Sequence, residues 1–337
     1  MKNKVAIVGT GFVGASYGYS LVNQGLVDEL VLIDVNKDNT IANRDDLIQA
    51  VAYLPNQPRI ISGDYEDAKD CDIICVTAGV NQKPGETRLQ LVEKNTKIME
   101  SVIDSIMATG FDGILLIASN PVDILTLVAQ KRSGLPKNRV IGSGTVLDSG
   151  RLRHYVGEYL GVNPVDVHGY IIGEHGDSSV PTYSTTTIGQ QPLMEYVKEM
   201  GKDQAGLDEC FVNARDAAYK IIEGKGATYY AIGVCLARIT KAILRNENKI
   251  LPCSCYLEDM YGESGIYTAI PCFVGKDGVN KVQKLPISEE EQVKFNQSCE
   301  QLKEIIKQYI FLWQQKKKIY YWLIFHKREQ YLTLLLV

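Results

Sequence analysis

Short apolar runs alternate with longer amphipathic stretches along the first 142 residues of the chain. Runs with the length and Val, Ile and Leu content of buried strands lie at residues 4–8, 30–34, 59–62, 71–78, 113–119 and 139–142. Helices are expected between them, at residues 15–23, 36–51, 88–109 and 121–132. Strands that alternate with helices favour a parallel sheet covered on both faces. The pattern predicts an α/β domain with a doubly wound parallel sheet over residues 1–142.

The regular alternation ends beyond residue 142. Helices are expected at residues 144–160, 207–223, 228–246 and 288–309, and strands at residues 165–172, 249–251, 265–274 and 279–283. Residues 181–188, rich in Thr, Tyr and Ser, are expected to form strand or irregular structure. This mixed order predicts a second, α+β domain over residues 143–309.

Residues 310–337 differ in composition from the rest of the chain. They hold both tryptophans, contain no Gly, Pro, Asp or Ala, and carry five basic residues against one acid. A helix lying on a membrane surface would gather its apolar residues on one face, but the apolar residues here lack clean helical spacing. We interpret the segment as an atypical hydrophobic and basic tail outside the two domains.

The first predicted strand runs into a glycine loop, Gly9-Thr10-Gly11-Phe12-Val13-Gly14, and a helix follows. Asp34 ends the second strand, 20 residues after Gly14. This order of strand, loop, helix and acid is typical of dinucleotide-binding sites. The glycines permit a tight turn, and the free N–H groups at the helix N-terminus meet the pyrophosphate. Asp34 would accept hydrogen bonds from ribose hydroxyls and repel a 2′-phosphate, so the pattern predicts NAD as the cofactor.

Gly79 and Asn120 follow two further predicted strands. Because ligands of such sheets bind beyond the carboxyl ends of the strands, both residues are expected beside the glycine loop along one cleft. The polar loop over residues 79–87, with a glycine near each end, is predicted to move as a lid that carries Arg88 over a substrate. An ordinary surface loop with a solvated Arg88 is the simpler alternative.

His175 lies in a glycine-rich loop, residues 173–177, whose small neighbours suit a side chain that faces a cleft. Asp148 and Arg151 are three residues apart in a predicted helix and therefore share one of its faces. Arg153 lies about 200° around the helix from Arg151 and must point elsewhere. Such features also occur without function, as a loop histidine bound to a backbone carbonyl or as a surface ion pair.

Composition narrows the class of protein. The chain has 337 residues, a net charge of −4, and 45% hydrophobic and 23% charged residues, which is ordinary for a globular protein and gives no basic face for nucleic acid. No run reaches the roughly 20 apolar residues of a spanning helix, and the first residues lack the features of a signal peptide. The eight cysteines are scattered without zinc-type spacing, so we predict no metal site and expect reduced thiols in the cytoplasm.

Six stretches carry a resemblance to a known family. Together they resemble the NAD-dependent L-lactate dehydrogenases of bacterial type, within the lactate/malate dehydrogenase superfamily, over residues 3 to 309. The resemblance implies a Rossmann domain followed by an α+β catalytic domain, and reversible reduction of pyruvate to (S)-lactate with NADH. The stretches are Val8–Gly14, Asn81–Arg88, Ser119–Asp123, Gly142–Asp148, Gly173–Asp177 and Lys225–Tyr230.

The resemblance also implies roles for individual residues. His175 would be the acid/base that protonates the new alkoxide, and Asp148 would fix its tautomer and stabilise the imidazolium. Arg151 would clamp the substrate carboxylate with two parallel hydrogen bonds, and Arg88 would polarise the carbonyl group. A cis peptide bond is implied before Pro121. Further implied contacts are Gln82, Asn120 and Thr228 with the substrate, and Gly9, Gly11, Phe12, Val13, Gly14, Asp34, Ala78, Gly79, Asn120 and Ser143 with NAD.

Gln82 bears on the choice of substrate. Malate dehydrogenases have Arg at the matching position, where it meets the second carboxylate of oxaloacetate. A neutral Gln would leave that charge unpaired in a closed site, which is costly, and Thr228 on the other side suits a small substrate. Pyruvate is therefore expected. A dehydrogenase of a bulkier 2-hydroxy acid such as 2-hydroxyisocaproate, a malate-type enzyme and an NAD-binding protein without turnover remain as alternatives.

Arg153 and His168 match positions at which many bacterial members bind fructose 1,6-bisphosphate between subunits. The resemblance implies a homotetramer that this sugar phosphate activates, while two solvated cations are the alternative.

Two departures from the family pattern concern assembly and the catalytic helix. Residues 42–46 replace a small acidic run that is usual in a subunit-contact helix, and Gly150 weakens the helix of Asp148 by about 1 kcal/mol.

Overall fold

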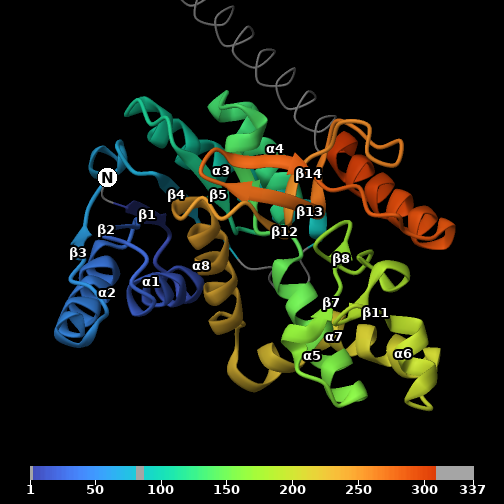
Figure 1. Cartoon of the computed structure of the whole chain (residues 1–337). Coiled ribbons are helices and arrows are strands. Elements are labelled where there is room, and N and C mark those ends of the chain that lie inside the picture. Colours follow the sequence, from blue (N-terminus) through green and yellow to red (C-terminus); the bar gives the residue numbers. More distant parts are fainter. Residues whose placement is uncertain (1–2, 81–86, 309–337) are drawn as a thin grey trace, which may run out of the picture.

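The computed structural model describes residues 3–80 and 87–308, which build one nine-stranded sheet and its surrounding helices (Figure 1). The strand order is β14-β13-β12-β6-β5-β4-β1-β2-β3, and the six strands from β3 to β6 pair in parallel. This confirms the predicted doubly wound sheet. The parallel strands are β1 (Lys4–Val8), β2 (Glu29–Ile33), β3 (Arg59–Ser62), β4 (Ile73–Val76), β5 (Ile114–Ile117) and β6 (Val140–Gly142).

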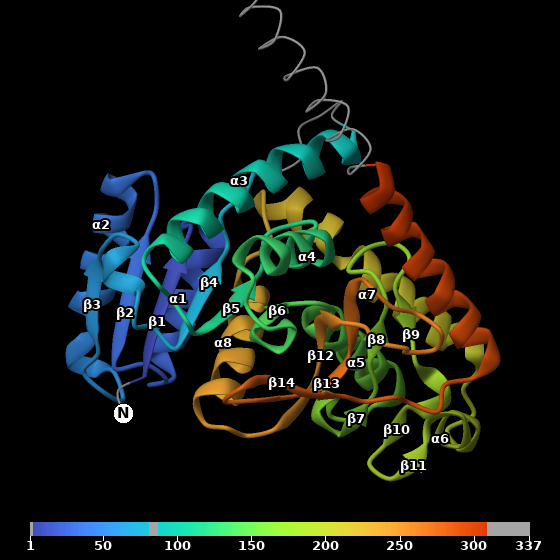
Figure 2. The same ribbon diagram turned by 90° about the horizontal axis from the view of Figure 1, so that it is seen from above.

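Helices cover both faces of the parallel strands, as the view from above shows (Figure 2). Side chains alternate between the faces along each strand, so the apolar runs supply two separate cores. One core packs against α1 (Phe12–Asn23) and α8 (Tyr230–Leu244), and the other against α3 (Arg88–Ala108) and α4 (Val122–Ser133). The polar helix α2 (Lys37–Gln49) packs against β3.

Strands from the second half of the chain extend the same sheet. The three strands β12 (Lys249–Tyr256), β13 (Tyr267–Gly275) and β14 (Gly278–Val282) pair antiparallel, and Ser254 of β12 pairs with Gly142 of β6. The strand expected to end at residue 251 runs on to Tyr256 because every residue of β12 pairs with β13. The predicted domain boundary therefore crosses a continuous sheet.

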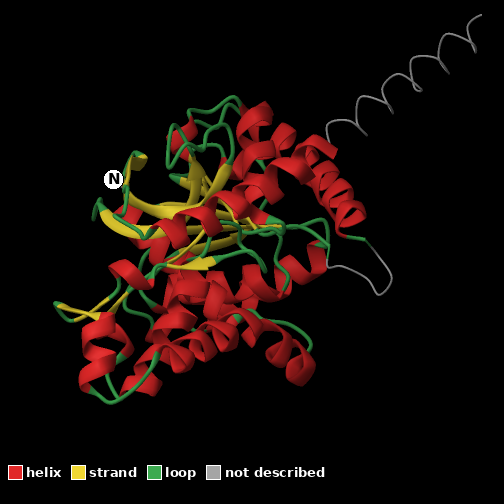
Figure 3. Ribbon diagram, turned by 90° about the vertical axis from the view of Figure 1, so that its right-hand side faces the viewer, coloured by secondary structure: helices red, strands yellow, loops and turns green. Residues whose placement is uncertain are grey.

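Most of the remaining elements pack around a third core beneath the sheet, in the lower part of Figure 3. The last helix, residues 289–308, instead places Phe295, Cys299 and Leu302 in the core that packs against α1 and α8. The single strand expected over residues 165–172 is wrong: the chain changes partner at Gly169, where β7 pairs with β10 and β8 pairs with β9. The short helix α6 was not predicted. The elements are α5 (Val146–Leu160), α6 (Leu193–Glu199), α7 (Gln204–Lys225), a last helix over residues 289–308, β7 (Val167–His168), β8 (Ile171–Ile172), β9 (Val180–Pro181), β10 (Thr187–Ile188) and β11 (Gln191–Pro192).

Three general features bear on function. In the described part of the chain, no helix combines the length and apolar character needed to cross a membrane. Over the same residues, no group of His, Cys, Asp and Glu side chains is arranged to hold a metal ion. All eight cysteines are free thiols, and seven of them are buried. The tail, residues 310–337, lies outside the described residues.

Candidate active site

The glycine loop connects β1 to α1 with the geometry of a phosphate cradle. Gly9 has φ +104°, and a Cβ there would lie 2.6 Å from the backbone nitrogen of Ala78. A Cβ on Gly14 would overlap the Gly9 carbonyl oxygen, whereas a Cβ on Gly11 would meet nothing within 4 Å. Helix α1 begins at Phe12, three residues earlier than expected. Its first turn can lie against the Gly9 carbonyl because Gly14 has no side chain. The open space at Gly11 beside a helix N-terminus fits a pyrophosphate.

Asp34 follows β2 and reaches the glycine loop. One oxygen, Oδ2, accepts hydrogen bonds from the Thr10 N–H at 2.6 Å and from the Thr10 hydroxyl at 3.2 Å. The other oxygen, Oδ1, accepts from the Asn36 N–H at 3.0 Å. Each carboxylate oxygen has two lone pairs, so Oδ1 retains room for a further donor such as a ribose hydroxyl. The acid therefore both fixes the loop and suits the predicted nucleotide contact.

The turn after β5 is tied to the loop after β4 by Asn95 of α3. The peptide bond between Asn120 and Pro121 is cis, which confirms the prediction. The Asn95 amide is buried; it donates to the Asn120 carbonyl oxygen at 2.7 Å and exchanges two hydrogen bonds with the main chain of Val80. Sequence reasoning missed Asn95, although a polar residue beside the apolar stripe of a predicted helix was a usable signal.

His175, Asp148 and Arg151 meet beyond this edge of the sheet. The Nδ1 atom of His175 lies 2.6 Å from Oδ2 of Asp148, and Nη1 of Arg151 lies 3.2 Å from Oδ1 of the same carboxylate. The side chains of Asp148 and Arg151 are each 12% exposed, and that of His175 is 26% exposed. Because an ionised carboxylate only accepts hydrogen bonds, Nδ1 carries the proton that faces Asp148, and Nε2 is left for a substrate.

The pKa of His175 is raised and the pKa of Asp148 is lowered, because each group favours the charged form of the other. The charge of Asp148 raises the pKa of the His175 imidazole above 6.5, against the lowering effect of burial. Burial acts to raise the pKa of the Asp148 carboxyl, but the His175 charge and hydrogen bond together with Arg151 outweigh it and hold that pKa below its usual range. The arrangement stabilises an imidazolium beside a carboxylate, as an acid/base group requires.

Comparison with known proteins agrees with this geometry. The family model of the lactate/malate dehydrogenase NAD binding domain matches residues 3–142, and that of the lactate/malate dehydrogenase alpha/beta C-terminal domain matches residues 145–311. The chain belongs to the lactate/malate dehydrogenase family. Membership makes it an NAD-dependent oxidoreductase, as the glycine loop and Asp34 indicated.

Relatives and solved structures agree over most of the chain. The chain is 54% identical over 303 residues to L-lactate dehydrogenase 2 of Bacillus anthracis, covering 90% of this chain and 96% of that protein. It is 52% identical over 305 residues to L-lactate dehydrogenase 2 of Peribacillus psychrosaccharolyticus, with the same coverage. The ligand-bound minor L-lactate dehydrogenase of Enterococcus mundtii superposes with a TM-score of 0.89 at 47% identity, covering 91% of this chain and 98% of that chain.

The structure describes some of the other predicted site residues but not all of them. Gln82 lies outside the described residues. Arg88 opens α3 behind the N-cap Thr87, whose side chain accepts from the Gln90 N–H in a capping box. Thr228 is half-buried in the short connection between α7 and α8. Phe12 is 68% exposed, and its ring stacks on the neighbouring Tyr229 at a centroid distance of 5.1 Å.

Arg153 points away from Asp148 and Arg151, as its place on the helix predicted. The Arg153 guanidinium donates to the carbonyl oxygens of Pro164 and Val165, at 3.1 Å and 2.9 Å. These contacts use two of its three nitrogens and hold it beside the start of β7. His168 is exposed in β7. Arg153 lies in α5 and His168 in β7, and the hydrogen bonds of Arg153 to the carbonyl oxygens before β7 hold these two elements together.

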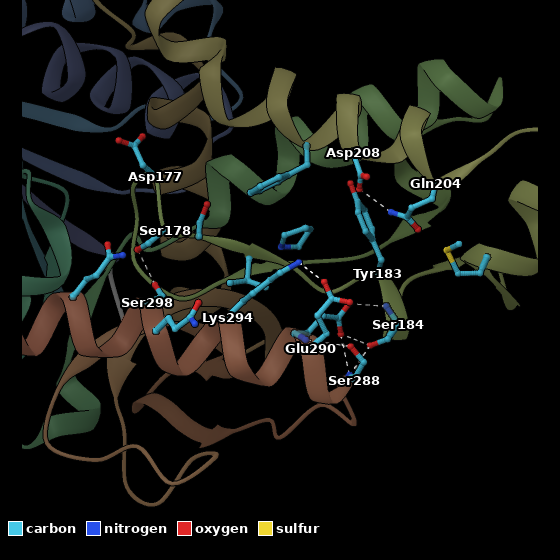
Figure 4. A pocket seen from close by; sticks show the side chains of 18 residues that line it. Asp177, Ser178, Tyr183, Ser184, Gln204, Asp208, Ser288, Glu290, Lys294 and Ser298 are labelled. Carbon is cyan, nitrogen blue, oxygen red and sulfur yellow. Dashed lines mark hydrogen bonds and ion pairs between the residues drawn. The ribbon is translucent and has the colours of Figure 1, made fainter.

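The loop over residues 173–177, which carries His175, is here called the catalytic loop. A cavity of about 670 Å³ lies next to it, between residues 177–184, α7 and the last helix (Figure 4). Among the side chains that line it, Ser178 contacts Ser298, and Lys294 pairs with Glu290 (Figure 4). Neither His175 nor Arg151 lines it, and its carboxylates outnumber its one lysine. A cavity of this charge does not suit an anionic keto acid. This cavity is therefore not the substrate site that the sequence predicted at His175.

Proposed function

We propose that this chain is an L-lactate dehydrogenase that reduces pyruvate to (S)-lactate with NADH and catalyses the reverse reaction, at the fermentative end of glycolysis. The contact that carries the proposal is the 2.6 Å hydrogen bond between His175 and a buried Asp148 that also holds Arg151. It lies at the strand ends where NAD binds in this fold. The names of the relatives support the same activity. Free thiols throughout the described chain suit a cytoplasmic enzyme.

The bound cofactor would rest on one edge of the sheet. Gly9, Gly11 and Gly14 would hold the pyrophosphate and Asp34 the adenosine ribose. When bound, NADH supplies the hydride that reduces the carbonyl carbon. The further cofactor contacts that we propose are Phe12, Val13, Ala78, Gly79, Asn120 and Ser143.

His175 would donate the Nε2 proton to the developing alkoxide oxygen and recover it in the reverse direction. Asp148 holds Nδ1 and stabilises the imidazolium, so the proton leaves from the nitrogen that faces the substrate. Arg151 would bind the substrate carboxylate with two parallel hydrogen bonds. Arg88 would polarise the carbonyl group from the start of α3. Excluding water around these groups would strengthen each interaction.

Substrate choice would depend on Gln82, Asn120 and Thr228. A neutral Gln82 opposes a second carboxylate, and a half-buried Thr228 leaves room for a methyl group. A panel of pyruvate, 2-ketoisocaproate and oxaloacetate, each with NADH, tests this choice. We expect the highest kcat/KM with pyruvate, and preference for either other acid would move the chain to another branch of the family.

The chain would be organised as an NAD-binding domain over residues 1–142, a substrate domain over residues 143–309 and a tail over residues 310–337. The continuous sheet supports a close junction between the first two, because β12 joins β6 directly. We propose that four copies assemble into a homotetramer.

Fructose 1,6-bisphosphate is expected to lower the KM for pyruvate by about fivefold or more, since typical couplings between sites are of that size. Arg153 and His168 would bind the phosphate groups, and Arg153 is already held in place by two carbonyl oxygens. Steady-state kinetics with and without the sugar phosphate measure the effect. The His168→Ala variant should lose it while keeping the KM that the enzyme shows without effector. An unchanged KM in the parent chain would remove the effector site.

A further inference from the structure

Asp123 occupies a junction between three parts of the chain that are distant in sequence. It lies in the first turn of α4, three residues after Asn120, and is only 3% exposed. Its Oδ2 accepts a hydrogen bond from the main-chain N–H of His175 at 2.9 Å. Its Oδ1 accepts from the buried hydroxyl of Ser254, in β12, at 2.6 Å. One carboxylate therefore connects the turn of Asn120, the catalytic loop and strand β12 of the sheet.

The catalytic loop is held by its main chain at three successive residues. The Gly173 N–H donates to the Ala269 carbonyl oxygen at 2.8 Å, and the Glu174 N–H donates to the Ser298 hydroxyl at 2.9 Å. The third donor is His175 itself, to Asp123. Of these three contacts, the third links the loop to the helix that begins behind Asn120. The position of the imidazole relative to the cofactor side of the site thus depends on Asp123.

We propose that Asp123 is a positioning residue for the reaction, whose buried carboxylate fixes the main chain of His175 against the Asn120 turn. The inference rests on the proposed function, because it assumes that His175 transfers the proton. A carboxylate suits the task since the two donors approach different oxygens, and each oxygen can only accept. Removing it would leave two buried donors without a partner and release the loop from α4.

The carboxylate also contributes to the electrostatics of His175. Within residues 3–80 and 87–308, the charged side chains that influence the imidazole are Asp148 and Arg151 from α5 and Asp123 from α4. Asp148 raises the pKa of His175 most strongly, Asp123 raises it further, and Arg151 lowers it. Burial raises the pKa values of the nearby Cys235 and Cys299 thiols. The hydrogen bond with Cys272, together with burial, raises the pKa of the Cys255 thiol, so all three thiols stay neutral. Burial raises the pKa of the Asp123 carboxyl itself, while the hydrogen bonds from Ser254 and His175 act to lower it. In its ionised form, Asp123 is a second negative charge that favours the protonated imidazole.

The test compares Asp123→Ala with Asp123→Asn in the full chain. The alanine variant should lose about 10- to 100-fold in kcat for pyruvate, since a misplacement near 1 Å costs up to about 10²-fold. Its KM and its affinity for NADH should change less than threefold, roughly, because Asp123 contacts neither ligand. The asparagine variant can keep both hydrogen bonds, since its oxygen accepts from the His175 N–H and its amide donates to a rotated Ser254 hydroxyl. We expect it to recover kcat to within about tenfold of the parent chain.

The pH profile separates positioning from mere stability. Pyruvate reduction uses the protonated imidazole, so its rate falls as the pH rises through the pKa of His175. Loss of the Asp123 charge should move this alkaline limb to lower pH in Asp123→Asn. The control is Glu291→Gln, which alters another buried carboxylate, on the last helix. That carboxylate accepts hydrogen bonds from the main-chain N–H groups of Ser184 and Ser288. Its alkaline limb should match that of the parent chain.

Two outcomes overturn the proposal. One is a folded Asp123→Ala variant whose kcat lies within about twofold of the parent value. The other is an equal loss of kcat in the alanine and asparagine variants with no movement of the alkaline limb, which indicates a purely structural role. Because the parent chain is assayed beside the variants, absence of any NADH consumption in the parent would instead refute the proposed function.

Discussion

Replacing His175 by Asn should lower the rate of pyruvate reduction by roughly 10²- to 10⁴-fold, the usual contribution of a general acid or base. Asparagine retains a group that can donate to Asp148, so the buried carboxylate keeps a partner. It cannot supply a proton to the alkoxide or accept one from lactate. Affinity for NADH should be unchanged, because no predicted cofactor contact is altered. Stopped-flow absorbance of NADH with saturating pyruvate measures the rate, and fluorescence titration measures the affinity.

His154 provides a matched control for this substitution. It lies on α5 like Asp148, but its side chain is 54% exposed and faces Glu158 at 3.5 Å. The His154→Asn variant should therefore turn over pyruvate like the parent chain. Turnover by His175→Asn within a few-fold of the parent rate would exclude His175 from proton transfer.

Replacing Arg151 by Lys should lower kcat/KM for pyruvate by about 10- to 100-fold, because a hydrogen bond to a charged group contributes roughly 1.5–3 kcal/mol. Lysine keeps the positive charge but cannot form the paired, planar contact with a carboxylate. It also weakens the ion pair to Asp148, now 3.2 Å long between buried groups. Most of the loss should appear in KM, since the carboxylate is bound before and during the reaction.

Arg132 is the control for the loss of an arginine fork. It binds Asp104 through two nitrogens, at 2.5 Å and 2.6 Å, on an exposed surface between α4 and α3. Arg132→Lys should leave the kinetics with pyruvate unchanged, since exposed ion pairs contribute little. An Arg151→Lys variant with the parent KM would show that another residue binds the substrate carboxylate.

Local patterns were sufficient to predict the parallel sheet, the glycine loop and the helical face shared by Asp148 and Arg151. Each depends on residues close together in sequence, where spacing alone determines which side chains meet. The resemblance to a known family added the pairing of His175 with Asp148, which spans 27 residues. Without it, periodicity would not have selected that carboxylate from the many acids of the chain.

Contacts between distant segments could not be predicted in this way. Ser254 meets Asp123 only because β12 extends to Tyr256 and joins the edge of β6, so the contact depends on a register between strands far apart in sequence. Asn95 reaches Asn120 only once α3 packs beside the sheet. The break between β7 and β8 arises likewise from their different partners, β10 and β9. Such residues become visible when tertiary structure brings them together.

The most direct test of the account is the consumption of NADH by the purified full-length chain in the presence of pyruvate, followed by absorbance. We predict that one NADH is oxidised for each (S)-lactate formed, and that kcat/KM for pyruvate exceeds the values for oxaloacetate and 2-ketoisocaproate. A chain that binds NADH but does not oxidise it with pyruvate, or that prefers oxaloacetate, would contradict the assignment of His175, Asp148 and Arg151 to lactate dehydrogenation.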